Sequence, residues 1–143
     1  YSSARRRQMG YHKALVEAGL PLRKELMVEA RETTFECGIE AVNQLLALAP
    51  RPTAIFVTNN GLTLGVVTGL CRAGVAVPRQ MSVLGFDNPP WASLFGLHGI
   101  MQATQELGRK AAFLLRQRME GFAGPPQRIV LETELVRGEE LGS

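Results

Sequence analysis

The chain has 143 residues, of which 45% are hydrophobic and 20% are charged, so it is long enough for one domain with an apolar core. Its net charge is only +3, and the densest basic cluster, Arg5-Arg6-Arg7, is short and lacks interleaved aromatic residues. We therefore do not expect this chain itself to bind nucleic acid. No apolar run approaches the roughly 18 residues that a membrane span needs, and no apolar stretch follows the N-terminal arginines as in a secretory signal. We expect a cytoplasmic protein without a membrane partner, and the missing initial Met indicates part of a longer chain.

The first part of the chain predicts two helices and a short strand. Apolar residues recur at helical spacing over residues 4–18, and Gly19 and Pro21 end that helix. Residues 26–30 are a strand candidate. A second amphipathic helix begins at a cap formed by Thr33 or Thr34 and runs to about Leu48.

The rest of the chain alternates strands with helices. We expect strands at 53–58, 81–86, 99–102 and 128–136, and helices at 62–73 and 105–120, with a loop over 88–98. Strands that alternate with helices imply parallel pairing. The predicted fold class is therefore α/β, with an open, mostly parallel, doubly wound sheet.

Polar side chains follow two of these strands where each strand ends. Asn59 comes directly after the strand at 53–58, and Asp87 comes directly after the strand at 81–86. Ligands of open parallel sheets bind outside the carboxyl ends of the strands. An amide, a carboxylate, an N-terminal Arg and the face of Trp91 would together suit a polyol, a sugar, a sugar acid or a nucleobase.

Each of these residues also has a structural interpretation. Asn59 is well placed to cap the helix that follows it, and Asp87 could form an Asx turn leading into Pro89-Pro90. Trp91 could belong to the core or to a dimer contact. Spacing alone leaves these alternatives open.

Signals for catalysis and for cofactors are weak. The sequence has no glycine-rich phosphate cradle, no nucleophile elbow and no zinc-binding helix motif, so we expect no cofactor. Cys37 and Cys71 have no metal-ligand spacing with His12 or His98, so we expect reduced core thiols and no metal. A small α/β enzyme that uses Asp87 as a base is a third interpretation, but we expect no enzyme.

Several motifs appear in a characteristic order: SSARRRQMGYHKALVEAGLP, then PRPTAIFVTNN, then GVAVPRQMSVLGFDN, then QxxxELGRxAAxLL, then LETELV. In these motifs the chain resembles the effector-binding core of the lac-repressor (LacI/GalR) family of transcription regulators, over nearly its whole length. The resemblance implies a lobe of the periplasmic-binding-protein-like type I fold, here truncated. The GFD strand resembles these regulators more than it resembles periplasmic sugar-binding proteins.

The resemblance implies roles for individual residues. Arg7, Asn59 and Asp87 match residues that line the effector cleft, and Gln102 matches a crossover residue that also reaches the effector. The candidates for stacking on the effector are Phe35, Trp91 and the missing lobe, because the family often has an aromatic residue where this chain has Thr33. The expected isologous dimer interface contains Leu64, Trp91 and Phe95.

The resemblance also implies a division of the chain. Residues 1–98 would form the C-terminal lobe without its first strand, residues 99–122 a crossover strand and helix that belong with the N-terminal lobe, and residues 123–143 a return strand and tail. The helix-turn-helix head and most of the N-terminal lobe have no counterpart. The crossover helix would therefore expose its apolar face if it stood alone, and Gly96-Leu97-His98-Gly99 departs from the family pattern before the crossover.

The sequence thus predicts the ligand-binding and dimerisation domain of a transcription regulator. Its partners would be a small polar effector (a sugar, sugar acid, polyol or purine), a second copy of the chain, and operator DNA only through the missing head. The alternative is a periplasmic-type solute-binding protein.

Overall fold

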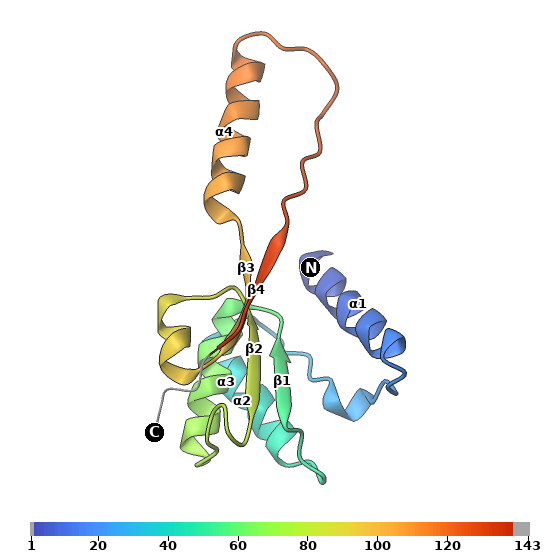
Figure 1. Cartoon of the computed structure of the whole chain (residues 1–143), viewed down its shortest axis with the longest axis vertical. Coiled ribbons are helices and arrows are strands. Elements are labelled where there is room, and N and C mark those ends of the chain that lie inside the picture. Colours follow the sequence, from blue (N-terminus) through green and yellow to red (C-terminus); the bar gives the residue numbers. More distant parts are fainter. Residues whose placement is uncertain (1, 139–143) are drawn as a thin grey trace.

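The computed structural model describes residues 2–138 and contains a four-stranded, mostly parallel sheet. The strands β1 (Ala54–Val57), β2 (Ser82–Phe86) and β3 (His98–Gln102) are parallel neighbours in this order, and β4 (Thr133–Val136) pairs antiparallel with β3. Ile55 pairs with Val83, and Leu84 pairs with His98. The predicted α/β class with a mostly parallel open sheet is confirmed (Figure 1).

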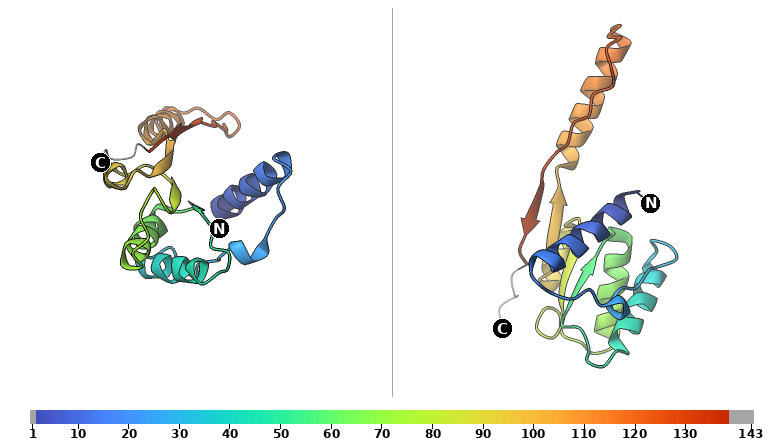
Figure 2. Two further views of the ribbon diagram at one scale, coloured as in Figure 1. Left: turned by 60° about the horizontal axis from the view of Figure 1, so that its bottom comes forward. Right: turned by 90° about the vertical axis from the view of Figure 1, so that its right-hand side faces the viewer.

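The core lies between the sheet and two helices, α2 (Phe35–Leu46) and α3 (Asn60–Arg72). Side chains alternate along each strand, so Ile55, Val57 and Val83 are buried with Val42 and Leu70 of the two helices. The opposite face of the sheet carries Phe56 and Phe86 and is approached by α1 (Ser2–Glu17), whose Tyr11 ring lies 6.4 Å from that of Phe56. Figure 2 shows α1 apart from the α2–α3 pair.

Helices α2 and α3 touch through glycines. Gly61, Gly65 and Gly69 recur every four residues of α3, on one side of the helix. A Cβ atom at Gly65 would lie 2.1 Å from the carbonyl oxygen of Phe35, and one at Gly69 would lie 2.4 Å from Cγ1 of Val42. The glycines therefore permit an approach that any side chain would prevent.

Two expected strands differ from the structure. Residues 24–26 form a short 3₁₀ turn, η1 (Lys24–Leu26), and residues 27–30 have no ladder, so the strand predicted at 26–30 is wrong. A strand needs a hydrogen-bonded neighbour, and the described residues supply none beside it. For the same reason the strand predicted at 128–136 is reduced to Thr133–Val136, where β3 is the partner.

The expected loop at 88–98 contains a 3₁₀ segment, η2 (Pro90–Phe95), which Gly96 ends in a left-handed conformation. The N–H of Gly96 donates to the carbonyl oxygens of Ala92 and Ser93, so the chain turns back into β3. Within residues 2–138, no helix is both long and apolar enough to cross a membrane.

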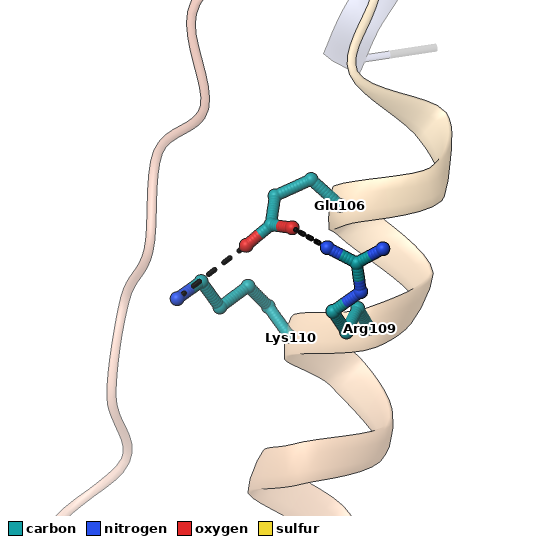
Figure 3. A network of polar contacts seen from close by, with 3 residues as sticks. All are labelled: Glu106, Arg109 and Lys110. Carbon is teal, nitrogen blue, oxygen red and sulfur yellow. Dashed lines mark hydrogen bonds and ion pairs between the residues drawn. The ribbon is translucent and has the colours of Figure 1, made fainter.

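Helix α4 (Thr104–Met119) projects from the end of β3, away from the α2–α3 layer, and an extended segment returns beside it to β4 (Figure 1). It has no fully buried residue, and Leu107, Leu115 and Met119 are exposed. Its first turns carry a local polar network in which Glu106 bonds to Arg109 at 2.9 Å and pairs with Lys110 at 3.5 Å (Figure 3). Exposed pairs of this kind contribute little, about 0.5 kcal/mol each.

Candidate functional site

Polar groups meet where the parallel strands end. Thr58 and Asn59 follow β1, Asp87 follows β2, and Gln102 ends β3, so adjacent strands bring them to one edge of the sheet. Arg7 reaches the same edge from α1. All five residues are half-buried, which leaves part of each side chain accessible to a ligand.

Arg7 is held by two contacts with the sheet. Its Nη1 donates a hydrogen bond to the carbonyl oxygen of Thr58 at 2.6 Å. Its guanidinium carbon lies 3.4 Å from the centroid of the Phe86 ring, a cation–π contact. Because a guanidinium has five N–H donors in a rigid fork, Arg7 keeps donors for a ligand after satisfying Thr58.

Asp87 is fixed to β3 through both its backbone and its side chain. Its N–H donates to the carbonyl oxygen of Ile100 at 2.9 Å. Its carboxylate accepts a hydrogen bond from Nε2 of Gln102, with the two atoms 2.5 Å apart. The backbone has φ of 79°, and Asp87 is the only non-glycine residue among those described with positive φ. The structure therefore shows the Asp87 carboxylate bound to Gln102 across the sheet rather than to its own loop in an Asx turn.

Asn59 caps helix α3, as its structural interpretation predicted. Its Oδ1 accepts a hydrogen bond from the N–H of Gly61 at 2.8 Å, and its backbone oxygen accepts from Oγ1 of Thr63 at 3.0 Å. The cap moves the start of α3 to Asn60, ahead of the predicted position. What Asn59 can offer to a ligand is its Nδ2 group, which donates.

Trp91 stands apart from this group of residues. It lies in η2, packs against the core, and makes an edge-to-face contact with Phe95 at 6.4 Å between ring centroids. No hydrogen bond or aromatic contact among the described residues joins Trp91 to Arg7, Asp87 or Gln102. The structure thus shows the packing role that the sequence left open, and effector stacking by Trp91 remains a prediction.

The residues predicted for a dimer interface lie on α3 and η2. Leu64 is 42% exposed on α3, whereas Trp91 and Phe95 are half-buried. Leu94, which lies in the same 91–95 segment, is 65% exposed on η2.

Sequence analysis missed Phe86 and the carbonyl of Thr58. The signal for Phe86 was present, because it alternates with the buried Val83 and Gly85 and must face the side of α1. The Thr58 carbonyl carries no signal in sequence, since every residue has one. Together these two groups position Arg7.

The same edge of the sheet carries N–H donors of Arg7 and Asn59 and one carboxylate acceptor, Asp87, to which Gln102 is bound. Such a mixture recognises groups that both donate and accept, above all hydroxyls. No cluster of ligating side chains that could hold a metal ion occurs in residues 2–138. The geometry therefore defines a class, an α/β lobe with polar side chains gathered at the carboxyl ends of its parallel strands.

Sequence comparison places the chain within that class. Residues 1–139 match the periplasmic binding protein-like domain family. The chain is 38% identical over 112 residues to catabolite control protein A of Priestia megaterium, covering 77% of this chain and 33% of that protein. It is 36% identical over 123 residues to the HTH-type transcriptional repressor PurR of Photobacterium profundum, covering 83% of this chain and 36% of that protein. The chain thus spans little more than a third of these relatives.

Solved structures agree with this assignment. A regulatory protein of LacI family from Chloroflexus aggregans superposes with a TM-score of 0.81 at 31% identity, over 92% of this chain and 48% of that one. The transcriptional regulator CelR in complex with cellobiose gives a TM-score of 0.81 at 33% identity, over 92% of this chain and 41% of that one. The chain belongs to the LacI family of transcriptional regulators, in their periplasmic binding protein-like, effector-binding domain.

Proposed function

We propose that the edge formed by Arg7, Asp87 and Asn59, beside which Gln102 is bound to Asp87, binds a small polar effector. Occupancy of this site would control DNA binding by a helix-turn-helix segment outside this chain. The observation that carries the proposal is the convergence of a pre-positioned guanidinium and a carboxylate at the ends of adjacent parallel strands. The family relationship supports a regulator rather than an enzyme. A regulator of transcription works in the cytoplasm, so we expect that location.

A sugar or sugar derivative is the effector class that this edge suits best. A sugar ring presents neighbouring hydroxyls, which can accept from Arg7 and donate to Asp87 at the same time. The related CelR structure is described as a cellobiose complex, which supports a saccharide in this family. Sugar acids, polyols and purines are the other candidates, because Arg7 also suits a carboxylate and Asp87 also suits a ring N–H.

The exposed helix α4 supports the proposed division of the chain. Residues 99–122 would join residues 1–98 to a second lobe, and residues 123–143 would return from it. Leu107, Leu115 and Met119 have 57%, 62% and 79% of their surface exposed, which is unusual for three large apolar side chains of one helix. A second lobe packed against α4 would cover them and close a cleft over the Arg7–Asp87 edge.

We also propose that the regulator is a homodimer. Leu64 of α3 and Leu94 of η2 are exposed on the two elements that the predicted interface uses, and Trp91 and Phe95 are partly buried against the core. An isologous contact would place the same residues of both copies against each other. The dimer would present two DNA-binding heads to one operator.

A thermal-shift screen of the full-length protein tests the proposed function. The compounds are two sugars (cellobiose and D-ribose), a sugar acid (D-gluconate), a polyol (sorbitol) and a purine (hypoxanthine). A ligand at 100 times its Kd should add about 2.7 kcal/mol to the free energy of unfolding. A shift with one class, absent in Asp87→Asn and retained in the exposed control Glu29→Gln, supports the assignment. A shift of equal size in both variants contradicts it.

A further inference from the structure

The contact between Gln102 and Asp87 joins the proposed effector site to the segments that leave the sheet. Gln102 is the last residue of β3, and α4 begins at Thr104. Gln102 is also paired with Thr133, the first residue of β4. Both connections to α4 therefore pass through the backbone of this one residue pair, while the side chain of Gln102 is bound to Asp87.

From this geometry, and resting on the proposed function, we propose that Gln102 is a positioning residue. Its amide holds the Asp87 carboxylate when the site is empty, and it is released when an effector hydroxyl takes that carboxylate. Gln102 then senses occupancy and passes it to the β3–α4 and β4 connections, rather than serving as an effector ligand in its own right.

The backbone of Asp87 supports this role. Asp87 has a backbone φ of 79°, a value that residues other than glycine seldom adopt. Its N–H donates to the carbonyl oxygen of Ile100 in β3. Two hydrogen bonds to one strand thus hold Asp87 in a conformation that its local sequence does not favour. Loss of the side-chain bond should loosen the backbone bond as well.

The chemistry of the pair makes the bond displaceable. The Gln102 amide is a neutral donor, and its bond is to Oδ1 of the Asp87 carboxylate. A sugar hydroxyl is a donor of similar strength, so exchange of one donor for the other costs little. A ligand can move the two connections only through such a difference in contacts between the empty and occupied states.

The first experiment needs no ligand and uses the full-length protein. Amide hydrogen exchange is measured for Asp87 in wild type, Gln102→Leu, Gln102→Glu and the control Gln105→Leu, which alters an exposed glutamine at the start of α4. Glutamate keeps the size of Gln102 but turns a donor into a like charge. We expect the Asp87 amide to exchange about tenfold faster in both Gln102 variants, which corresponds to about 1.4 kcal/mol. If the Asp87 amide exchanges at the wild-type rate in a Gln102 variant that is folded, the inference is overturned.

The second experiment uses cellobiose as the probe and separates positioning from direct binding. We expect Gln102→Leu to bind as tightly as wild type or more tightly, while the ligand-induced change in exchange over residues 102–104 and 131–136 disappears. Binding about tenfold weaker would make Gln102 an effector ligand and overturn the inference. Equal ligand-induced changes in both proteins would also overturn it.

The same data distinguish this inference from the proposed function. If Asp87→Asn loses cellobiose binding while Gln102→Leu behaves as wild type in both experiments, the site stands and only the positioning role fails. If Asp87→Asn binds cellobiose as well as wild type, the proposed site itself fails. If wild type does not bind cellobiose, the exchange of Asp87 without ligand decides the positioning role.

Discussion

The guanidinium of Arg7 lies over the ring of Phe86, 3.4 Å from its centroid, and this contact joins helix α1 to the residue that precedes Asp87. The hydrogen bond from Arg7 to Thr58 fixes the same side chain to the end of β1. Arg7 is therefore positioned by the folded lobe, not by the ligand. A donor that is already in place costs less conformational entropy on binding.

Arg7→Lys should weaken effector binding because lysine has neither the planar fork nor the stacking surface of arginine. We expect Kd to rise at least about tenfold and the free energy of unfolding to fall by about 0.5–1 kcal/mol, the usual size of an exposed cation–π contact. Titration calorimetry and urea denaturation measure the two effects. Arg6→Lys, an exposed neighbour on α1, is the control and should change neither; equal effects at both positions would contradict the assigned role.

Gly65→Ala should destabilise the lobe although alanine is the better helix former. The new Cβ would meet the carbonyl oxygen of Phe35 at 2.1 Å, so α2 and α3 must separate. We expect a loss of about 1–3 kcal/mol, as for other overpacked sites. The same substitution at Gly10 of α1 meets nothing within 4 Å and should gain about 1 kcal/mol. A stabilised Gly65→Ala protein would show that the two helices are not packed as described.

Leu64→Glu should convert the proposed dimer into monomers. A carboxylate placed twice in an isologous interface loses its hydration and faces its own copy. The matched control is Leu20→Glu, which changes a similarly exposed leucine next to the end of α1. Analytical ultracentrifugation of the full-length protein measures the mass of the particle in solution and so distinguishes a monomer from a dimer. A dimer that persists in Leu64→Glu would place the interface elsewhere.

Leu115→Ser tests whether α4 is exposed to solvent in the 143-residue chain and covered by a second lobe in the full-length protein. In the 143-residue chain Leu115 is 62% exposed, so the substitution should change the free energy of unfolding by less than about 0.5 kcal/mol. In the full-length protein a second lobe would bury it, and the cost should reach about 1–3 kcal/mol. Denaturant titrations of both proteins provide the comparison. Equal effects in the two would argue against a lobe packed on this face.

The sequence was sufficient to predict the features that depend on local pattern. Alternating apolar segments ended by turn residues indicated β1, α3, β2 and α4, and the strand ends indicated that Asn59 and Asp87 lie at one edge of the sheet. Features that depend on a tertiary neighbour were not predictable. Residues 27–30 have strand-like composition but no partner among the described residues, and the positive φ of Asp87 depends on its contacts with β3.

The side-chain contacts of the site show the same limit. Asn59 had two interpretations from sequence, and the structure confirms the helix cap, which uses its Oδ1. Binding of an effector by Asn59 stays a prediction. The stacking of Arg7 on Phe86 joins residues far apart in the chain, so no spacing could indicate it. Long-range pairs of this kind decide which polar atoms remain for a ligand.

The most direct test of the central claim is titration calorimetry of the full-length protein with the compound that stabilises it most, in wild type, Asp87→Asn and Glu29→Gln. Asparagine tolerates positive φ, so the first variant removes the charge and leaves the backbone undisturbed. Each charge-assisted hydrogen bond is worth about 1.5–3 kcal/mol, which predicts a Kd about 10–100-fold higher in Asp87→Asn and unchanged in Glu29→Gln. An unchanged Kd in Asp87→Asn would contradict the claim that this edge of the sheet binds the effector.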